Sequence, residues 1–276
     1  MAARKRLYEL EDSEFEAEYT QRQLRPVGDE GAGASPSAYP DLDSFFAEGL
    51  ITEVLYLVKS GKEATVYCCR AGESLGVELV AAKIYRAAEH RNFKNDTIYQ
   101  EGRIVLNQRT RRAMQKKTEH GREAHFGLWI GHEFEHLKLL HKIGAATPRP
   151  FKQADRAILM EYFGDEQQAA PILNRVSLEP AEVRPLFNFA MANIELWLKH
   201  NLIHADLSPF NILYQEGQLK IIDFPQAVDP RFNPHAYDLL ERDITNLCRY
   251  WQRYGLEAQA EQITKRLWTR FQNSQL

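Results

Sequence analysis

The spacing of the apolar residues changes along the chain, and this change constrains the fold more than any other feature. Between residues 54 and 85, short β-branched and aromatic segments are separated by Gly-bearing turns, which predicts an antiparallel meander of strands. Beyond residue 182, apolar residues recur at helical spacing over 182–200, 234–254 and 257–271. Strands that come first and helices that come later predict an α+β protein with two lobes.

The first 40 residues differ in composition from the rest of the chain. Residues 27–40 are mostly Gly, Ala, Ser and Pro, a composition that cannot bury a core and indicates a flexible tether. We therefore predict a flexible N-terminal arm and linker over residues 1–40, followed by one folded domain over 41–276. Its predicted parts are an N-lobe at about 41–163 that contains a basic insertion at 86–127 and a helix over 128–143, and a C-lobe at about 164–276.

Composition excludes several classes of protein. The 276 residues carry a formal charge of −3, which argues against a general binder of polyanions. No run approaches the ~20 apolar residues of a membrane helix, and the first residues lack the apolar core of a signal peptide. The three cysteines form neither a disulfide framework nor a zinc-ribbon spacing. We therefore expect a globular protein of the cytoplasm that makes no membrane contact.

Two segments near the last third of the chain carry the residue types that phosphoryl transfer needs. HADLSPFN at 204–211 follows a predicted helix, and IIDF at 221–224 closes a predicted hairpin. The chemistry requires a carboxylate that orients the attacking hydroxyl and oxygen ligands for Mg²⁺. Asp206 suits the first task, and Asn211 and Asp223 suit the second. Because the segments are close in sequence, we expect one tight hairpin to bring the three side chains together.

Two further residues are expected to support this loop rather than to react. His204 is predicted to be a structural hydrogen-bonding residue of the loop. Asp243, on the predicted helix over 234–254, is expected to cap backbone N–H groups of the His204–Asn211 segment.

Two segments of the predicted sheet complete the set. SGKEATVY at 60–67 is a turn between strands; Ser60, Gly61 and Lys62 are expected to bind phosphate through backbone N–H groups and the lysine charge. Lys83 lies in the apolar strand segment VAAKI, and a buried ammonium needs an anionic partner. In kinases such a lysine contacts ATP phosphates and pairs with a helix glutamate. The ordered set therefore predicts an ATP- and Mg²⁺-dependent phosphotransferase.

Taken together, SGKEATVY, AAKIY, LIHADLSPFNILY, KIIDF and PHAYDLLERDI resemble the RIO family of atypical serine/threonine protein kinases over about residues 52–251. The phosphate loop of the branch in question reads close to S-T-G-K-E-A-x-V-Y. The resemblance implies a truncated two-lobe kinase fold, with ATP and Mg²⁺ or Mn²⁺ in the cleft. It also implies that Lys83 is the ATP lysine, Glu133 its partner, Met160 the gatekeeper, and Glu161 and Phe163 the sources of backbone groups for adenine.

The same resemblance implies that Asp206 is the proton acceptor and that Asn211 and Asp223 hold the metal. It makes Asp223 a transient phospho-aspartate site, and it implies autophosphorylation or ATP hydrolysis. Ala205 and Ser208 replace the arginine and lysine of typical kinases, and no A-P-E segment follows Asp223. These departures agree with the RIO pattern and leave the protein substrate open.

Three other interpretations stay open from the sequence. HEFEH at 132–136 satisfies the H-E-x-x-H signature of zinc proteases and uses the same Glu133. Small-molecule kinases of the aminoglycoside and choline type also combine an H-x-D…N loop with an I-D-[FW] strand end. The basic residues between Arg86 and Arg122 are a candidate contact for RNA or the ribosomal subunit, or else a solvated insertion.

Overall fold

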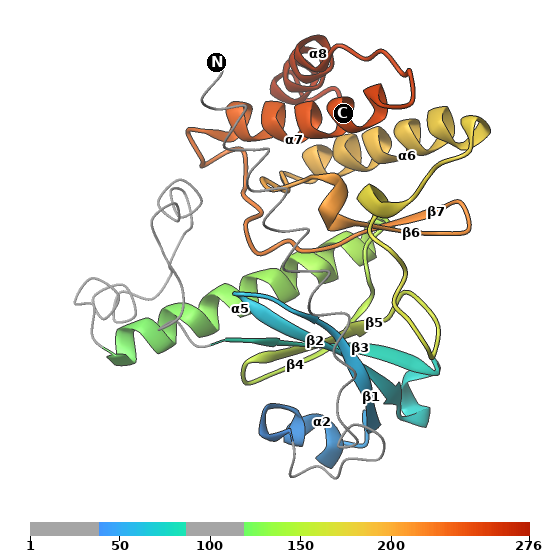
Figure 1. The fold of residues 1–276 in the computed structure, drawn as a ribbon. Helices are drawn as coiled ribbons and strands as arrows, with labels where there is room; N and C mark the ends of the chain where they lie inside the picture. Colours follow the sequence, from blue (N-terminus) through green and yellow to red (C-terminus); the bar gives the residue numbers. More distant parts are fainter. Residues whose placement is uncertain (1–38, 87–118) are drawn as a thin grey trace.

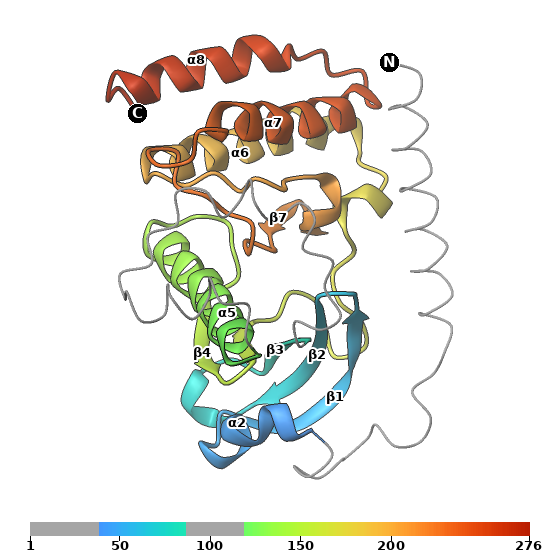
Figure 2. The same ribbon diagram turned by 90° about the vertical axis from the view of Figure 1, so that its left-hand side faces the viewer.

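The structure, a computed structural model, describes residues 39–86 and 119–276. The predicted N-terminal arm and residues 87–118 of the predicted basic insertion lie outside the described residues. The described chain forms two lobes: a sheet with a long helix across it, and a stack of helices facing a two-stranded hairpin (Figures 1 and 2). This arrangement confirms the α+β class and the division into a sheet lobe and a mainly helical lobe.

The N-lobe is built on one antiparallel sheet with the strand order β1-β2-β3-β5-β4. A short helix packs on one face of the sheet, and a long helix crosses the other (Figures 1 and 2). The elements are η2 (Pro40–Leu42), α2 (Asp43–Ala47), β1 (Ile51–Ser60), β2 (Ala64–Ala71), η3 (Glu73–Leu75), β3 (Leu79–Tyr85), α5 (Glu119–Lys142), β4 (Pro150–Ala154) and β5 (Ala157–Glu161).

The side chains of β3 point alternately to the two faces of the sheet and so pack into two different hydrophobic clusters. Val80 and Ala82 pack with Phe45 of α2 in a small cluster. Ala81 and Tyr85 face the opposite side, where they join the larger cluster that includes α5 and the C-lobe. Because successive side chains of a strand point to opposite faces, Lys83 shares the face of Ala81 and Tyr85 and looks toward the C-lobe.

The C-lobe stacks helices behind a hairpin that faces the sheet. The hairpin turns at Glu216 and Gly217, with φ values of 50° and 76°, as a two-residue type I′ turn requires. A reciprocal capping box between Glu179 and Glu182 starts the first long helix. The elements are η6 (Leu173–Arg175), α6 (Pro180–Lys199), η7 (Pro209–Asn211), β6 (Ile212–Gln215), β7 (Gln218–Ile221), α7 (Ala236–Gln252) and α8 (Ala260–Gln272).

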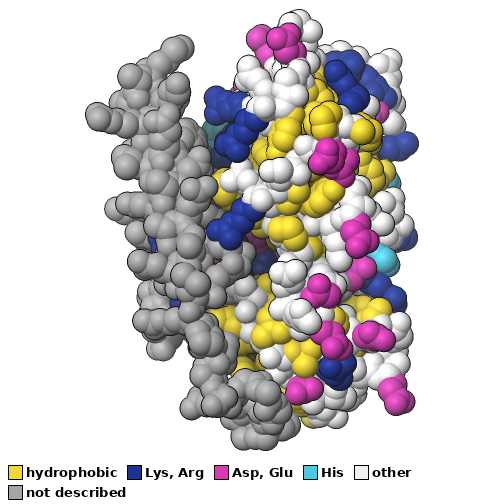
Figure 3. Space-filling model, turned by 45° about the vertical axis from the view of Figure 1, so that its right-hand side comes forward, with side chains coloured by type: hydrophobic (Ala, Val, Ile, Leu, Met, Phe, Trp, Pro, Cys, Tyr) yellow, Lys and Arg dark blue, Asp and Glu magenta, His cyan; other side chains and the backbone are white. Residues whose placement is uncertain are grey.

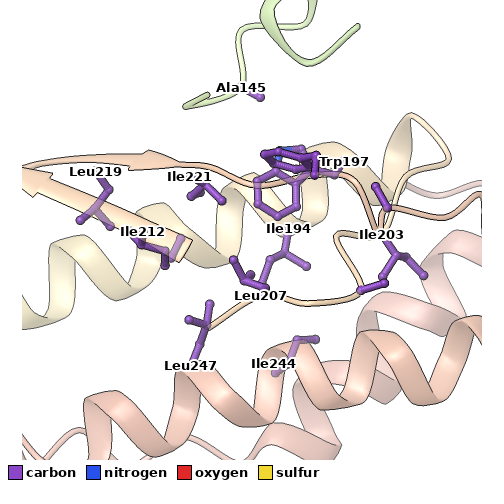
Figure 4. Close-up of a cluster of buried hydrophobic side chains, with 14 of the residues drawn as sticks. Ala145, Ile194, Trp197, Ile203, Leu207, Ile212, Leu219, Ile221, Ile244 and Leu247 are labelled. Carbon is purple, nitrogen blue, oxygen red and sulfur yellow. The ribbon is translucent and has the colours of Figure 1, made fainter. Parts of the chain in front are cut away.

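The hydrophobic core of the C-lobe holds the HADLSPFN segment in place through Leu207. Leu207, in the middle of this segment, is 1% exposed and lies among Ile194 of α6 and Ile244 and Leu247 of α7 (Figure 4). Trp197 of α6 packs against the same cluster. The apolar residue of the segment is thus buried between two helices, which fixes the polar residues on either side of it.

One predicted boundary is wrong, and two elements of the structure were not predicted. Helix α5 begins at Glu119, earlier than the predicted 128, so the end of the predicted basic insertion is helical. Strand β4 and the short α2 were not predicted: β4 is an edge strand whose residues are all half-buried, and α2 is too short to show a period.

Within residues 39–86 and 119–276, no helix combines the length and apolar character needed to cross a membrane.

Candidate active site

An ion-paired lysine joins the two lobes at the centre of the site. Lys83 Nζ lies 2.8 Å from Glu133 Oε1 of α5 and 2.7 Å from Asp223 Oδ1, just after β7. The Glu133 side chain is 2% exposed and that of Lys83 is 11% exposed, so both charges are largely removed from water. Tyr85 donates its hydroxyl to the other oxygen of Glu133. One ammonium therefore ties β3, α5 and the C-lobe together.

The charges of this cluster stabilise one another. Burial alone lowers the pKa of Lys83, but the carboxylates of Asp223 and Glu133 outweigh it and hold that pKa well above its usual value. Burial raises the pKa of Asp223, but the Lys83 ammonium outweighs it and holds that pKa below its usual value. The lysine is therefore a cation and Asp223 an anion at neutral pH.

Helix α7 holds the backbone of the HADLSPFN segment. Asp243 is 2% exposed, and its carboxylate accepts bonds from the N–H groups of Ala205 (2.8 Å) and Leu207 (2.9 Å). This confirms the predicted capping role. Arg242 donates to the carbonyl of Ala205, and Asn246 donates to that of Leu207 at 3.0 Å. Both flanks of Asp206 are thus fixed through the backbone.

Asp206 itself presents a carboxylate that solvent can reach. Surrounding protein atoms remove part of its hydration, and the negative charge of Asp223 adds to this; together they raise the pKa of Asp206 to about 6. Ala205, directly before it, has a φ of 65°, a left-handed conformation that costs a non-glycine residue about 1–2 kcal/mol. Such backbone strain persists where surrounding bonds over-determine it, as the α7 contacts do here.

His204 has the structural role that the sequence predicts. Its Nε2 lies 3.1 Å from the carbonyl oxygen of Ile222, to which it donates. Burial lowers the pKa of His204 to about 4, so the ring is neutral at pH 7. The ring also packs on Phe224, with 4.4 Å between centroids, and on Trp197. This histidine couples the segment containing Asp206 to the residues around Asp223.

The donor set for a divalent cation fits Mg²⁺. The amide nitrogen of Asn211 donates to the backbone carbonyl of Asp206 at 2.9 Å, so the amide oxygen is the atom that would bind the predicted metal. Asp223, with a φ of 72°, bonds Lys83 through one carboxylate oxygen and has a second oxygen for a cation. Carboxylate and amide oxygens are the ligands that hard cations such as Mg²⁺ prefer, with phosphate oxygens and water completing the shell.

The turn after β1 contains the predicted phosphate-binding residues, and two of them make bonds within the chain. Ser60 pairs with Thr65, on the sheet face opposite to Lys83, and Arg86 donates to the Ser60 hydroxyl at 2.6 Å. Gly61 donates its N–H to the carbonyl of Ala64 at 2.9 Å. The Ser60 side chain and the Gly61 N–H are thus used within the loop, whereas the Lys62 side chain is exposed.

The residues expected at the adenine end lie together at the end of β5 and directly after it. Met160 is 8% exposed and pairs with Ala81 on the cleft face of the sheet, two positions before Lys83. The Glu161 N–H donates to Arg149, and its carboxylate bonds Lys220 of β7 at 2.9 Å, a second link between the lobes. The Phe163 carbonyl accepts from the Ala170 N–H, so the backbone group of Phe163 that would serve the predicted adenine contact is its N–H.

The structure disfavours the zinc-protease interpretation, because Glu133, which would be the general base of such an enzyme, is bonded to other residues. Glu133 of the HEFEH segment is bound by Lys83 and Tyr85 rather than facing a metal. The rings of His132 and His136 have centroids 6.2 Å apart on α5. In the part of the chain that the structure describes, no group of three or more His, Cys, Asp or Glu side chains is arranged to hold a metal ion.

Several site residues were not predicted from the sequence. Tyr85, Arg86, Arg242 and Asn246 act through contacts between distant segments, which spacing does not reveal. Lys59 precedes the phosphate loop on the cleft face of β1. The only signal for it is that the chain has Lys at the first position of the S-T-G-K-E-A-x-V-Y pattern.

Comparisons with known proteins show the family to which the chain belongs. The sequence model of the RIO domain matches residues 65–263. Serine/threonine-protein kinase rio1 of Schizosaccharomyces pombe is 31% identical over 212 residues, 74% of this chain and 39% of that protein. RIO1 of Homo sapiens is 28% identical, over 78% of this chain and 36% of that protein. The RIO-type kinase Rio1 of Methanocaldococcus jannaschii is 28% identical, over 81% of this chain and 71% of that protein.

The fold is also that of solved RIO structures. A crystal structure of the Rio2 kinase-ADP/Mg²⁺-phosphoaspartate complex from Chaetomium thermophilum superimposes with a TM-score of 0.61. It is 24% identical, over 83% of this chain and 65% of that chain. The chain spans only 39% of the first curated relatives that it matches. The family model covers most of the described residues, and the chain therefore belongs to the RIO domain family.

Proposed function

We propose that the chain is an ATP- and Mg²⁺-dependent phosphotransferase of the RIO serine/threonine kinase type, acting in autophosphorylation, in ATP hydrolysis, or in both. The observation that carries this proposal is the Lys83 ammonium, held 2.8 Å from Glu133 and 2.7 Å from Asp223. An ammonium with two carboxylates, one on each lobe, is the arrangement that positions the ATP phosphates in kinases. Family membership and the fold support the same activity.

The side chains have distinct roles in this proposal. Lys83 binds the α- and β-phosphates, Glu133 orients the lysine, and Met160 closes the back of the adenine pocket. Asn211 and Asp223 hold Mg²⁺, which neutralises charge on the phosphates. Asp206, ionised above its pKa of about 6, accepts the proton of the attacking hydroxyl or water. The bond between the γ-phosphorus and its bridging oxygen breaks, ADP leaves, and a new phosphorus–oxygen bond forms on the acceptor.

Asp223 is a second possible acceptor of the phosphoryl group within this proposal. A Rio2 kinase of the same fold was crystallised as a phosphoaspartate complex. In this chain Asp223 is anionic and has one carboxylate oxygen that does not bond Lys83. Transfer to that oxygen gives an acyl phosphate and ADP, and water then releases phosphate and restores the carboxylate.

The proposal also includes a location in the cytoplasm and a contact with RNA or the ribosomal subunit. The RNA or ribosomal contact depends on residues 87–118, which lie outside the described residues. On the described part of the face in Figure 3, Lys and Arg side chains are interspersed with Asp, Glu and hydrophobic ones. Such a mixed face offers no extended basic surface for a polyanion.

The test is phosphate transfer from γ-labelled ATP by the purified chain with Mg²⁺ or Mn²⁺. We expect label on the protein or in free phosphate, and loss of both when the metal is chelated. Asp206→Asn should lower the rate at least about 100-fold, because general-base catalysis contributes ~10²–10⁴-fold. Asp238→Asn removes an exposed carboxylate of α7 and should leave the rate unchanged. Equal rates for Asp206→Asn and the unchanged chain would contradict the proposal.

A further inference from the structure

Lys59 lies near the end of β1, on the face of the sheet that looks into the cleft. The register pairs Lys59 with Val66 and Val66 with Lys83. Residues directly opposite each other on antiparallel strands project to the same face. Val66 packs against the large core that includes the C-lobe, which fixes that face as the inner one. Lys59 is therefore two strands from Lys83, with about 10 Å between their backbones.

The surrounding charges place the Lys59 ammonium toward the metal-binding end of the cleft. Burial lowers the pKa of Lys59; the Asp223 carboxylate works against this by favouring the charged form, whereas the cations Lys83 and Arg175 add to it. Arg175 ends η6 in the C-lobe, so Lys59 on β1 lies within electrostatic reach of cations from β3 and from the C-lobe. Asp223 is already bonded to Lys83. Cations that face one another across a partly dehydrated cleft attract an anion into the space between them.

At this position the sequence departs from the family pattern that it resembles. The related phosphate loops read close to S-T-G-K-E-A-x-V-Y, and here KSGKEATVY places Lys59 where that pattern has its first Ser. On the C-lobe side, Ser208 occupies the position of the lysine that typical kinases hold near the γ-phosphate. The positive charge that the C-lobe segment lacks is thus supplied from the opposite wall of the cleft.

We propose that Lys59 is a further phosphate-binding residue, which contacts the nucleotide phosphates from β1 and raises the affinity of this chain for phosphorylated adenine nucleotides. The inference rests on the proposed function, because it assigns the anion in the cleft to ATP. The charge of Lys83, which binds the phosphates in the proposed function, is shared with Glu133 and Asp223. Lys59 adds a second positive charge on the same face of the sheet, two strands from Lys83.

The test compares equilibrium binding of adenosine, ADP and ATP, with Mg²⁺ present, by titration calorimetry. Lys59→Gln keeps most of the side-chain length and removes the charge, and Lys59→Arg keeps the charge. Lys265→Gln removes one charge from an exposed site on α8 and is the matched control. We expect Lys59→Gln to weaken ATP binding about 10-fold, equivalent to ~1.4 kcal/mol. Adenosine affinity should not change, and Lys59→Arg and Lys265→Gln should bind ATP like the unchanged chain.

The outcomes separate this proposal from the function on which it rests. ATP binding by the unchanged chain that Lys59→Gln leaves intact would overturn the role of Lys59 and leave the proposed function standing. An equal loss of adenosine and ATP affinity would also overturn it, since it would reflect damage to the adenine pocket. If the unchanged chain binds no ATP at all, both proposals fail. Melting curves without nucleotide check that each variant is folded.

Discussion

Replacing Asp243 by alanine should remove the contacts that hold the HADLSPFN segment in place. We expect both the activity and the stability of the domain to fall. The carboxylate is 2% exposed and accepts two backbone N–H bonds, from Ala205 at 2.8 Å and Leu207 at 2.9 Å. Both donors belong to buried residues, so water cannot replace the lost acceptor without opening the site. Asp206 lies between them, and a shift of this backbone displaces the proposed base.

The magnitude follows from the two donors left without a partner. An unsatisfied buried N–H costs about 1–3 kcal/mol, so Asp243→Ala should lower the free energy of unfolding by roughly 2–6 kcal/mol. A domain of this size loses about 2–4 °C of Tm per kcal/mol, which gives a fall of roughly 4–24 °C. The total free energy of unfolding of a domain is ~5–15 kcal/mol, so this single change should remove a large part of it.

Urea unfolding followed by tryptophan fluorescence measures this change. Burial raises the pKa of Asp243 to about 7, against the effect of its two N–H bonds, so the assay is run at about pH 8, where the carboxylate is ionised. Asp238→Ala, an exposed substitution on the same helix, should change stability by less than about 0.5 kcal/mol. A similar small change for Asp243→Ala would refute the argument that α7 holds the loop through this carboxylate.

Three further predictions concern the residues of the site. The value of kcat/KM for ATP turnover should fall as the pH drops through about 6, with a slope of one proton, because the raised pKa of Asp206 leaves it protonated below that pH; a profile that stays flat down to about pH 4 would contradict its role as the base. Glu133→Gln should lower kcat/KM for ATP at least about 10-fold, since Lys83 loses one of its two carboxylates. His132→Ala should leave ATP turnover unchanged, whereas a zinc protease would lose its activity with that histidine.

Residues that are close in sequence were predictable because their spacing already determines how they meet. Asp206, Asn211 and Asp223 flank one hairpin, and the short turn at Glu216 and Gly217 brings its ends together. The core pattern was predictable for the same reason, since strand and helix periods are local properties. The α+β lobes followed from these periods without any knowledge of long-range contacts.

Contacts between distant segments required either the resemblance or the structure. Glu133 lies 50 positions from Lys83, and only the family pattern named it as the partner of that lysine. The face of each β1 side chain could not be read from alternation, because the β1–β2 register shifts at three points along the strand. For that reason the cleft-facing position of Lys59 was overlooked, and the contact of the Ser60 hydroxyl with Arg86 was not foreseen.

The central claim is that carboxylate and amide groups near Lys83 hold a divalent cation that carries a triphosphate. The most direct test is a crystal structure of the chain with a non-hydrolysable ATP analogue and Mg²⁺. We expect one Mg²⁺ bound by both the Asn211 amide oxygen and the Asp223 carboxylate, with phosphates within reach of Lys83 and Lys59. A nucleotide bound elsewhere, or a Mg²⁺ that contacts neither Asn211 nor Asp223, would contradict the account.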